Sequence, residues 1–216
     1  MKFLTLLAGC VMSAAPPMGW VCRAGDDKFV RDAANAIATS GMRAAGYITI
    51  YAPGAAGLKP YLESKGLRLM TGGIDAPRID GLPLEAQRST FTMSAMQAAP
   101  LIVDGDPRAM SAATRSIVLN RELIAIDQDS LRQPGSLLAK QGDIEIWTRA
   151  LSSGRTAVAL FNRGGEPADV RVRWPDLGLK RNRRVRDVWA RRNLGSLTDA
   201  FVGNLKPQGV ILLLID

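Results

Sequence analysis

The sequence predicts an α/β half followed by an all-β half, the latter an antiparallel β-sandwich. First, a β-branched strand at 47–51, a helix and a second strand at 67–70 follow one another, an order typical of parallel sheets. Second, the pattern changes near residue 133, after which short strand-like runs are separated by turn signals. Third, 216 residues with 47% hydrophobic content suffice for one large or two small globular domains.

The amino-terminal segment 1–14 has the outline of a secretory signal. Lys2 precedes an apolar run at 3–11 that is too short to span a bilayer, and small residues follow. The motif LAGC, which ends at Cys10, also fits a bacterial lipoprotein signal, and the third alternative is an apolar segment that stays attached. We expect a secreted or periplasmic protein, or a lipoprotein through Cys10. We expect no transmembrane segment, because no later apolar run is long enough.

Helices and strands alternate between residues 26 and 126. Asp26 can cap the first helix, and Pro83 can open a later one. Gly, Pro and Asp dominate 71–82, which predicts a loop. The expected elements are helix 26–40, strand 47–51, a helix around 58–62, strand 67–70, loop 71–82, helix 83–97, strand 101–103, helix 111–119 and a short apolar stretch at 122–126.

The second half follows the turn signal QPGS at 133–136. Short apolar runs at this spacing, without a helix between them, are typical of a sandwich. The expected strands are 137–140, 143–150, 156–162, 168–174, 185–189, 197–202 and 209–215. We therefore place the domain limits at 1–14 for the signal, 15–133 for the α/β domain and 134–216 for the sandwich.

Composition restricts the chemistry. There is no histidine, which excludes Ser-His and Cys-His catalysis and the usual zinc sites, and we expect neither metal nor cofactor. Two cysteines, Cys10 and Cys22, cannot build a disulfide framework. The net charge of +8 favours acidic partners. The arginine-rich run at 179–192 contains a single aromatic residue, so we expect a solvated hairpin and no nucleic-acid partner.

Several segments resemble glycoside hydrolase family 27, the α-galactosidase or melibiase family. The segments that carry the resemblance are APPMGW, ATSGMRAAGYITI, LKPYLESKGLRL, FTMSAMQAAPLIVDGDPRAM, LNRELIAIDQDSL, GDIEIWTRALSSGRTAVALFNRGGEPADVRVRW, VRDVWARRNLG and PQGVILLLI. The resemblance implies a (β/α)8 barrel followed by an antiparallel sandwich. It also implies retaining hydrolysis of terminal α-galactosides by two aspartates, whose carboxyl groups such chemistry holds about 5 Å apart.

Part of that barrel is absent from the sequence. A (β/α)8 barrel takes at least about 200 residues, whereas roughly 118 lie between the signal and residue 133. In the numbering of the family's barrel strands, the likeness passes from the third strand near Met70 directly to the seventh at Gly72-Gly73, so about three strand–helix units are missing. The resemblance places the nucleophile and the acid/base aspartate in these missing units. We therefore predict a partial barrel, assign no catalytic residue and expect the chain to be inactive. The unpaired edge strands of a partial barrel could pair with a second copy of the chain, so a homo-oligomer is an alternative to a monomer.

The substrate-binding residues are also reduced. Trp20 alone stays in register with the sugar-facing set, which makes it the candidate for substrate contact, with core packing as the alternative. The family's aspartate pair after strand two matches Tyr51-Ala52, and its second pocket tryptophan matches Arg23. By resemblance the function is α-galactoside hydrolysis; the alternative is an exported, non-catalytic sandwich that binds a glycan or a protein partner.

The other polar and aromatic candidates each have a structural role as the alternative to a functional one. We expect the aspartates of the seventh- and eighth-strand likenesses to cap loops; these are Asp75, Asp80, Asp104 and Asp106. Asp127 and Asp129 match a turn after the barrel, and we expect them to hold the domain junction together. Three tryptophans could form a sugar platform but are expected to serve packing; these are Trp147, Trp174 and Trp189.

Overall fold

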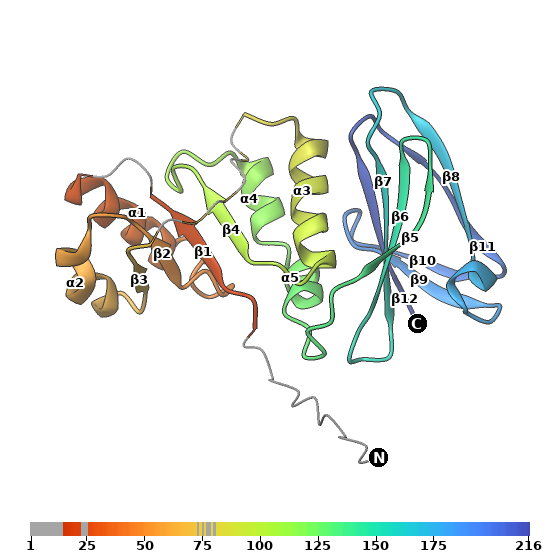
Figure 1. Cartoon of the computed structure of the whole chain (residues 1–216), viewed down its shortest axis with the longest axis horizontal. Coiled ribbons are helices and arrows are strands. Elements are labelled where there is room, and N and C mark those ends of the chain that lie inside the picture. The colour runs from red at the N-terminus through yellow and green to blue at the C-terminus, as the bar shows by residue number, and fades with distance from the viewer. Residues whose placement is uncertain (1–14, 23–25, 73, 75, 77–78, 80) are drawn as a thin grey trace, which may run out of the picture.

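The computed structural model describes residues 15–22, 26–72, 74, 76, 79 and 81–216. The chain forms an α/β half and an all-β half that lie side by side along the long axis of the molecule (Figure 1). This confirms the predicted order of an α/β region followed by antiparallel strands. The predicted signal at 1–14 with Cys10, and also Arg23, Asp75 and Asp80, lie outside the described residues.

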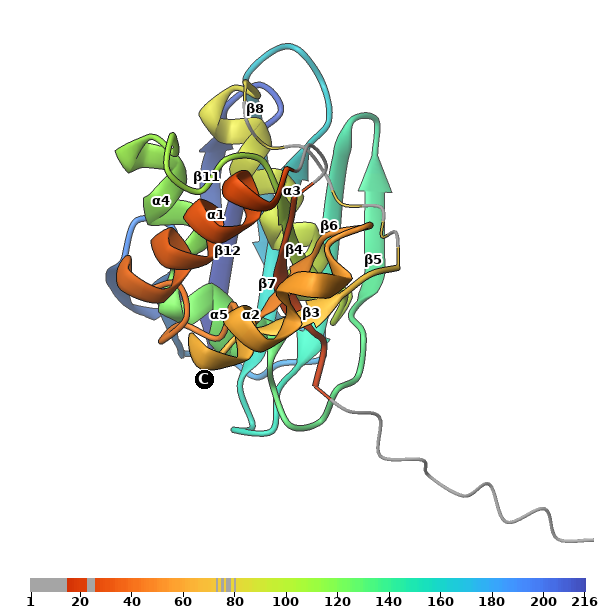
Figure 2. The ribbon, with the colours of Figure 1, turned by 90° about the vertical axis from the view of Figure 1, so that its left-hand side faces the viewer.

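The α/β half is built on four parallel strands in the order β3-β2-β1-β4. The strands are β1 (Met18–Val21), β2 (Thr49–Tyr51), β3 (Arg68–Met70) and β4 (Leu101–Asp104). The helices are η1 (Ala56–Leu58), α1 (Asp27–Thr39), α2 (Lys59–Ser64), α3 (Leu84–Met96), α4 (Ala112–Val118) and α5 (Arg121–Asp127). When the molecule is viewed along its long axis from the side of the α/β half, α1 and α2 lie nearest the viewer (Figure 2).

Side-chain caps explain where several helices begin. The Asp26 side chain accepts a hydrogen bond from the Phe29 backbone N–H at 2.8 Å, so α1 starts where the sequence predicts. The apolar stretch at 122–126 is helical, because Asn120 accepts hydrogen bonds from the backbone N–H groups of Glu122 and Leu123. Among described residues of 71–82, which contain the seventh-strand likeness, no strand forms.

The all-β half contains eight strands in place of the expected seven. They are β5 (Ser136–Gln141), β6 (Ile144–Ala150), β7 (Thr156–Asn162), β8 (Ala168–Arg173), β9 (Arg183–Asp187), β10 (Arg192–Leu197), β11 (Ala200–Leu205) and β12 (Val210–Ile215), with a short helix η2 (Trp174–Leu177). A six-stranded sheet, β10-β9-β12-β7-β6-β5, faces the pair β11-β8. The missed strand is β10. The Asp187 carboxylate accepts from the backbone N–H groups of Trp189 and Ala190, and this turn separates β9 from β10.

One apolar core runs through both halves. Along β7, Val158 and Leu160 face the sandwich interior, whereas Ala159 and Phe161 face α3. Phe91 of α3 belongs to the same cluster as the outer face of β7, so this helix is packed between the parallel sheet and the sandwich. The described residues contain no helix long and apolar enough to cross a membrane.

The chain passes from one half to the other at Gly135. Its N–H donates to the Met96 carbonyl oxygen at 2.7 Å. A Cβ atom at this position would stand 2.6 Å from the Thr148 carbonyl oxygen and 2.9 Å from that of Met96. Only glycine fits here, because contacts that short with backbone atoms would displace the end of α3 or β6.

Candidate functional site

Parallel α/β enzymes carry their chemistry at the carboxyl ends of the strands. Here side chains alternate between two faces of the sheet. Trp20 and Cys22 point toward the helices, whereas Val21, Tyr51 and Ile102 form a cluster on the opposite, inner face. Ile74 and Ala76 of the following loop pack on that cluster. The inner face therefore presents apolar side chains, with Asp104 of β4 on the same face in register with Val21.

Trp20, the residue predicted to contact substrate, is only 1% exposed. Its indole Nε1 donates to the Gly105 carbonyl oxygen at 2.6 Å, and its ring meets that of Tyr47 edge to face, with 6.2 Å between centroids. This environment agrees with the core-packing alternative. The sugar contact of Trp20 stays a prediction.

Two carboxylates near the end of β4 share one guanidinium. Arg108 contacts Asp106 at 2.7–3.1 Å and Asp32 at 3.1 Å. The hydrogen bond from Arg108 lowers the pKa of Asp106, and that from Lys28 lowers the pKa of Asp32. Both groups are therefore ionised at neutral pH, and neither is suited to donate a proton to a leaving group.

The other titratable groups at this end are not catalytic candidates either. Asp104 is buried (7% exposed) and already interacts with a neighbour. Asp106 accepts a hydrogen bond from the Arg108 backbone N–H at 2.9 Å, which is the loop-capping role predicted for it. Burial, with the charges of Asp106 and Asp104, raises the pKa of the Cys22 thiol to about 12. That thiol stays protonated and is a poor nucleophile. Nowhere in the described part of the chain do three metal-ligating side chains gather.

A second charged cluster lies at the junction of the two halves. Arg149 of β6 is 2% exposed and donates to the carbonyl oxygens of Ala95 and Asp127. Burial raises the pKa of the Asp127 carboxyl to about 7, against the lowering effects of a hydrogen bond from Gln128 and the charge of Arg149. A carboxyl with that pKa could serve as an acid, but this one is fully buried between α5 and the sandwich, out of reach of substrate.

Asp129 links the end of α5 to the turn after β6. Its carboxylate accepts hydrogen bonds from the backbone N–H of Ser152 at 3.0 Å and from its hydroxyl at 2.7 Å. Burial alone would raise the pKa of Asp129, but these hydrogen bonds bring it below its usual value. The junction role predicted for Asp127 and Asp129 agrees with these contacts.

The three tryptophans of the sandwich all donate their indole N–H groups within the fold. Trp174 is fully buried and donates its Nε1–H to the Leu197 carbonyl oxygen at 2.9 Å. Trp189 donates to the Thr92 hydroxyl at 2.9 Å, and Trp147 donates to Glu145 at 3.3 Å. Each indole is engaged within the fold, as the packing alternative predicts.

The arginine-rich run forms ion pairs on the surface. Arg186 contacts Glu122 at 2.5 and 2.8 Å, and Arg181 contacts Asp199 at 2.7 Å. Several of the positive charges are therefore partly neutralised within the chain. This arrangement supports the predicted solvated hairpin.

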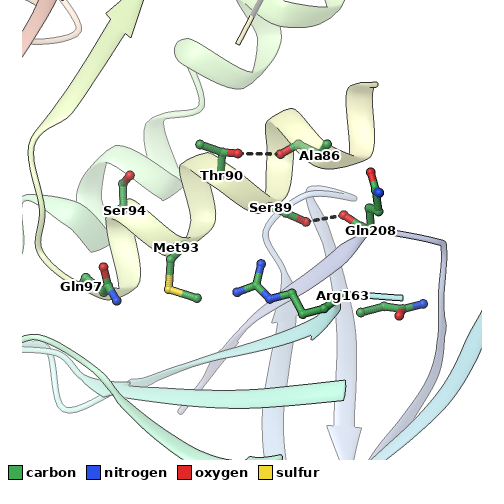
Figure 3. A pocket seen from close by; sticks show the side chains of 9 residues that line it. Ala86, Ser89, Thr90, Met93, Ser94, Gln97, Arg163 and Gln208 are labelled. Carbon is green, nitrogen blue, oxygen red and sulfur yellow. Dashed lines mark hydrogen bonds between the residues drawn. The ribbon is translucent and has the colours of Figure 1, made fainter. Parts of the chain in front are cut away.

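A groove of about 460 Å³ lies between α3 and the sandwich (Figure 3). It is lined by Ala86, Ser89, Thr90, Met93, Ser94, Gln97, Asn162, Arg163 and Gln208. The groove was not predicted from the sequence, because its walls come from three segments that are distant along the chain. The only signal was a second, polar face on the predicted helix 83–97, with Thr90, Ser94 and Gln97 three to four residues apart.

Residues 141–215 match the family model described as the α-galactosidase C-terminal β-sandwich domain. α-Galactosidase 2 of Arabidopsis thaliana is 39% identical over 111 residues, which cover 50% of this chain and 28% of that protein. The α-galactosidase of Coffea arabica is 40% identical over 112 residues, 51% of this chain and 30% of that protein. The chain thus spans less than a third of the length of these relatives.

Two solved structures share the fold. α-Galactosidase I from Mortierella vinacea aligns with a TM-score of 0.82 at 16% identity, covering 93% of this chain and 96% of that chain. A family 27 β-L-arabinopyranosidase from Geobacillus stearothermophilus aligns with a TM-score of 0.60 at 20% identity, covering 91% and 49%. These likenesses confirm the predicted fold class, a partial (β/α) barrel followed by an antiparallel β-sandwich.

Proposed function

Because this chain belongs to glycoside hydrolase family 27, the α-galactosidase family, and covers only part of it, we propose that it has the family's fold without the hydrolytic reaction. Retaining hydrolysis needs one carboxylate as nucleophile and one protonated carboxyl about 5 Å away. The observation that carries the proposal is the Arg108 bridge: Asp32 and Asp106 are bound to one guanidinium, and both pKa values are lowered. That pair contains no acid.

A chromogenic α-galactoside tests this proposal. Purified full-length protein should release no more nitrophenol than buffer does. Asp104→Asn and Asp106→Asn should leave that background unchanged, with the exposed Asp143→Asn as a matched control. Turnover that either of the first two substitutions abolishes, and the control does not, would show that this sheet end is catalytic after all.

The activity that such a chain could retain is binding without hydrolysis. We propose that the exported chain binds a glycan, and the groove at α3 favours this role over a purely structural one. Calorimetric titration of the full chain with melibiose should give heat of binding and no release of galactose. A chain that binds no sugar but captures a protein partner would replace this role with the other predicted alternative.

Export and self-association are proposed on sequence grounds. In a secreting bacterial host, mass spectrometry should find the mature chain cleaved near residue 14, or acylated at Cys10 if the lipoprotein alternative holds. A full-length mass would contradict both. A homo-oligomer stays a proposal based on β3 and β4, the outer strands of the parallel sheet. Sedimentation at two concentrations would decide it, since a single monomer peak at both contradicts association.

A further inference from the structure

We propose that the groove between α3 and the sandwich binds a short neutral saccharide. This assignment deepens the binding role proposed above and rests on it. Its volume of about 460 Å³ falls within the range of small-molecule sites, roughly 300–1,000 Å³. Its walls are α3 on one side and the segments at 162–163 and 208 on the other (Figure 3).

The two walls are fixed relative to each other. The Ser89 hydroxyl donates to the Gln208 carbonyl oxygen at 2.7 Å, and Lys206 contacts Glu85 at 3.1 Å. Asn162 holds the second wall together by donating to the carbonyl oxygens of Glu166 and Lys206. The groove is therefore formed before a ligand arrives, which limits the entropy lost on binding.

Unused hydrogen-bonding groups stand on both walls. Within the described part of the chain, the side chains of Ser94, Gln97 and Gln208 have no hydrogen-bond partner. The Thr90 hydroxyl donates to the Ala86 carbonyl oxygen at 2.9 Å and can still accept. Hydroxyls and amides offer donors and acceptors together. Sugar hydroxyls, which also donate and accept, match this set better than an apolar ligand does.

The charge of the groove argues for a neutral ligand. Arg163 is the only charged residue of the lining, and its Nε donates to Glu145 at 3.1 Å. Its guanidinium lies 4.2 Å from the centre of the Phe161 ring, which holds it in place. Met93 and Arg163 point into the same gap from opposite walls (Figure 3). Met93 gives the ring carbons of a sugar an apolar contact.

Nuclear magnetic resonance of the ¹⁵N-labelled full chain tests the assignment. Melibiose and cellobiose, titrated separately, should shift the side-chain amide signals of Gln97 and Gln208. Gln97→Ala and Gln208→Asn should each weaken binding up to about tenfold, the effect of one lost hydrogen bond. Asparagine is chosen at position 208 because its φ of 54° suits that residue. The exposed Gln133→Ala is the matched control and should bind like the parent.

The competing outcomes are distinct. Saturable binding that both groove variants leave intact, or shifts confined to residues 104–108, would overturn the groove while the binding role stands. No binding of either sugar by the folded chain would overturn both the groove and the binding role. The hydrolysis proposal is decided separately by the chromogenic assay.

Discussion

An aspartate lies near an arginine both at the carboxyl end of the parallel sheet and at the junction of the two halves, but the pKa of the carboxyl is shifted in opposite directions at the two places. Asp106 and Arg108 meet near the surface, where a hydrogen bond lowers the pKa of the carboxyl. Asp127 and Arg149 lie inside the protein, where burial raises the pKa of the carboxyl to about 7. A shifted carboxyl pKa therefore does not by itself mark an active site. The group with the pKa of a catalytic acid is the one that no substrate can reach.

The largest effect is expected at Arg149. Arg149→Met leaves the carbonyl oxygens of Ala95 and Asp127 buried without their side-chain donor, which should lower the free energy of unfolding by about 1–3 kcal/mol for each unpaired acceptor. Urea denaturation measures the change. The exposed Arg155→Met is the matched control and should leave the midpoint nearly unchanged. Equal losses for the two variants would show that the junction is no more sensitive than the surface.

The pH dependence of stability should expose Asp127 next. Its folded pKa of about 7 exceeds the ordinary value of 3.8, so its contribution is fully present below about pH 4 and falls as the pH rises to 7. Each pKa unit corresponds to about 1.4 kcal/mol. Asp127→Asn should flatten this slope in urea titrations between pH 4 and 8.

Asp129 supplies the opposite control. Its pKa is lowered in the folded chain, so its contribution is present above pH 3.8 and is lost as the pH falls through the folded pKa. Asp129→Asn should therefore reduce stability at neutral pH and leave the slope between pH 4 and 7 in place. A slope that survives Asp127→Asn would have to come from another group.

A smaller effect is expected at Ser89. Ser89→Ala removes its hydrogen bond to the Gln208 carbonyl oxygen and should cost about 1 kcal/mol in the free energy of unfolding. Ser116→Ala is the matched control, because that exposed hydroxyl bonds within its own helix segment. If both variants lose the same free energy of unfolding, the hydrogen bond between Ser89 and Gln208 stabilises the fold no more than a hydrogen bond within one helix does.

The smallest effect is expected at the sheet end. Arg108→Gln breaks an ion-pair network whose side chains are 29–41% exposed, so the urea midpoint should not move measurably. The pKa of Asp106, followed by NMR, should rise toward its ordinary value, because the hydrogen bond from Arg108 is its largest cause of lowering. A large loss of stability would mean that the sheet end and the junction are equally structural.

The sequence predicted the longer helices and the strands that became β2, β3 and β4, but it missed the strands β1 and β10 and the helical state of α5. The Asp26 cap and the helix at 26–40 could be predicted, because a 13-residue helix repeats its pattern several times. β1 has four residues that are all buried, so it gives no alternation, and α5 is as short as a strand. The groove could not be predicted from sequence, because α3, Arg163 and Gln208 meet only in the folded chain.

The crossing at Gly135 has a consequence for how the molecule comes apart. The backbone there is wedged between the end of α3 and β6, with no room for even a methyl group. A backbone held at this residue by α3 and β6 cannot act as a hinge between the two halves. Heating should therefore melt both halves in one calorimetric transition.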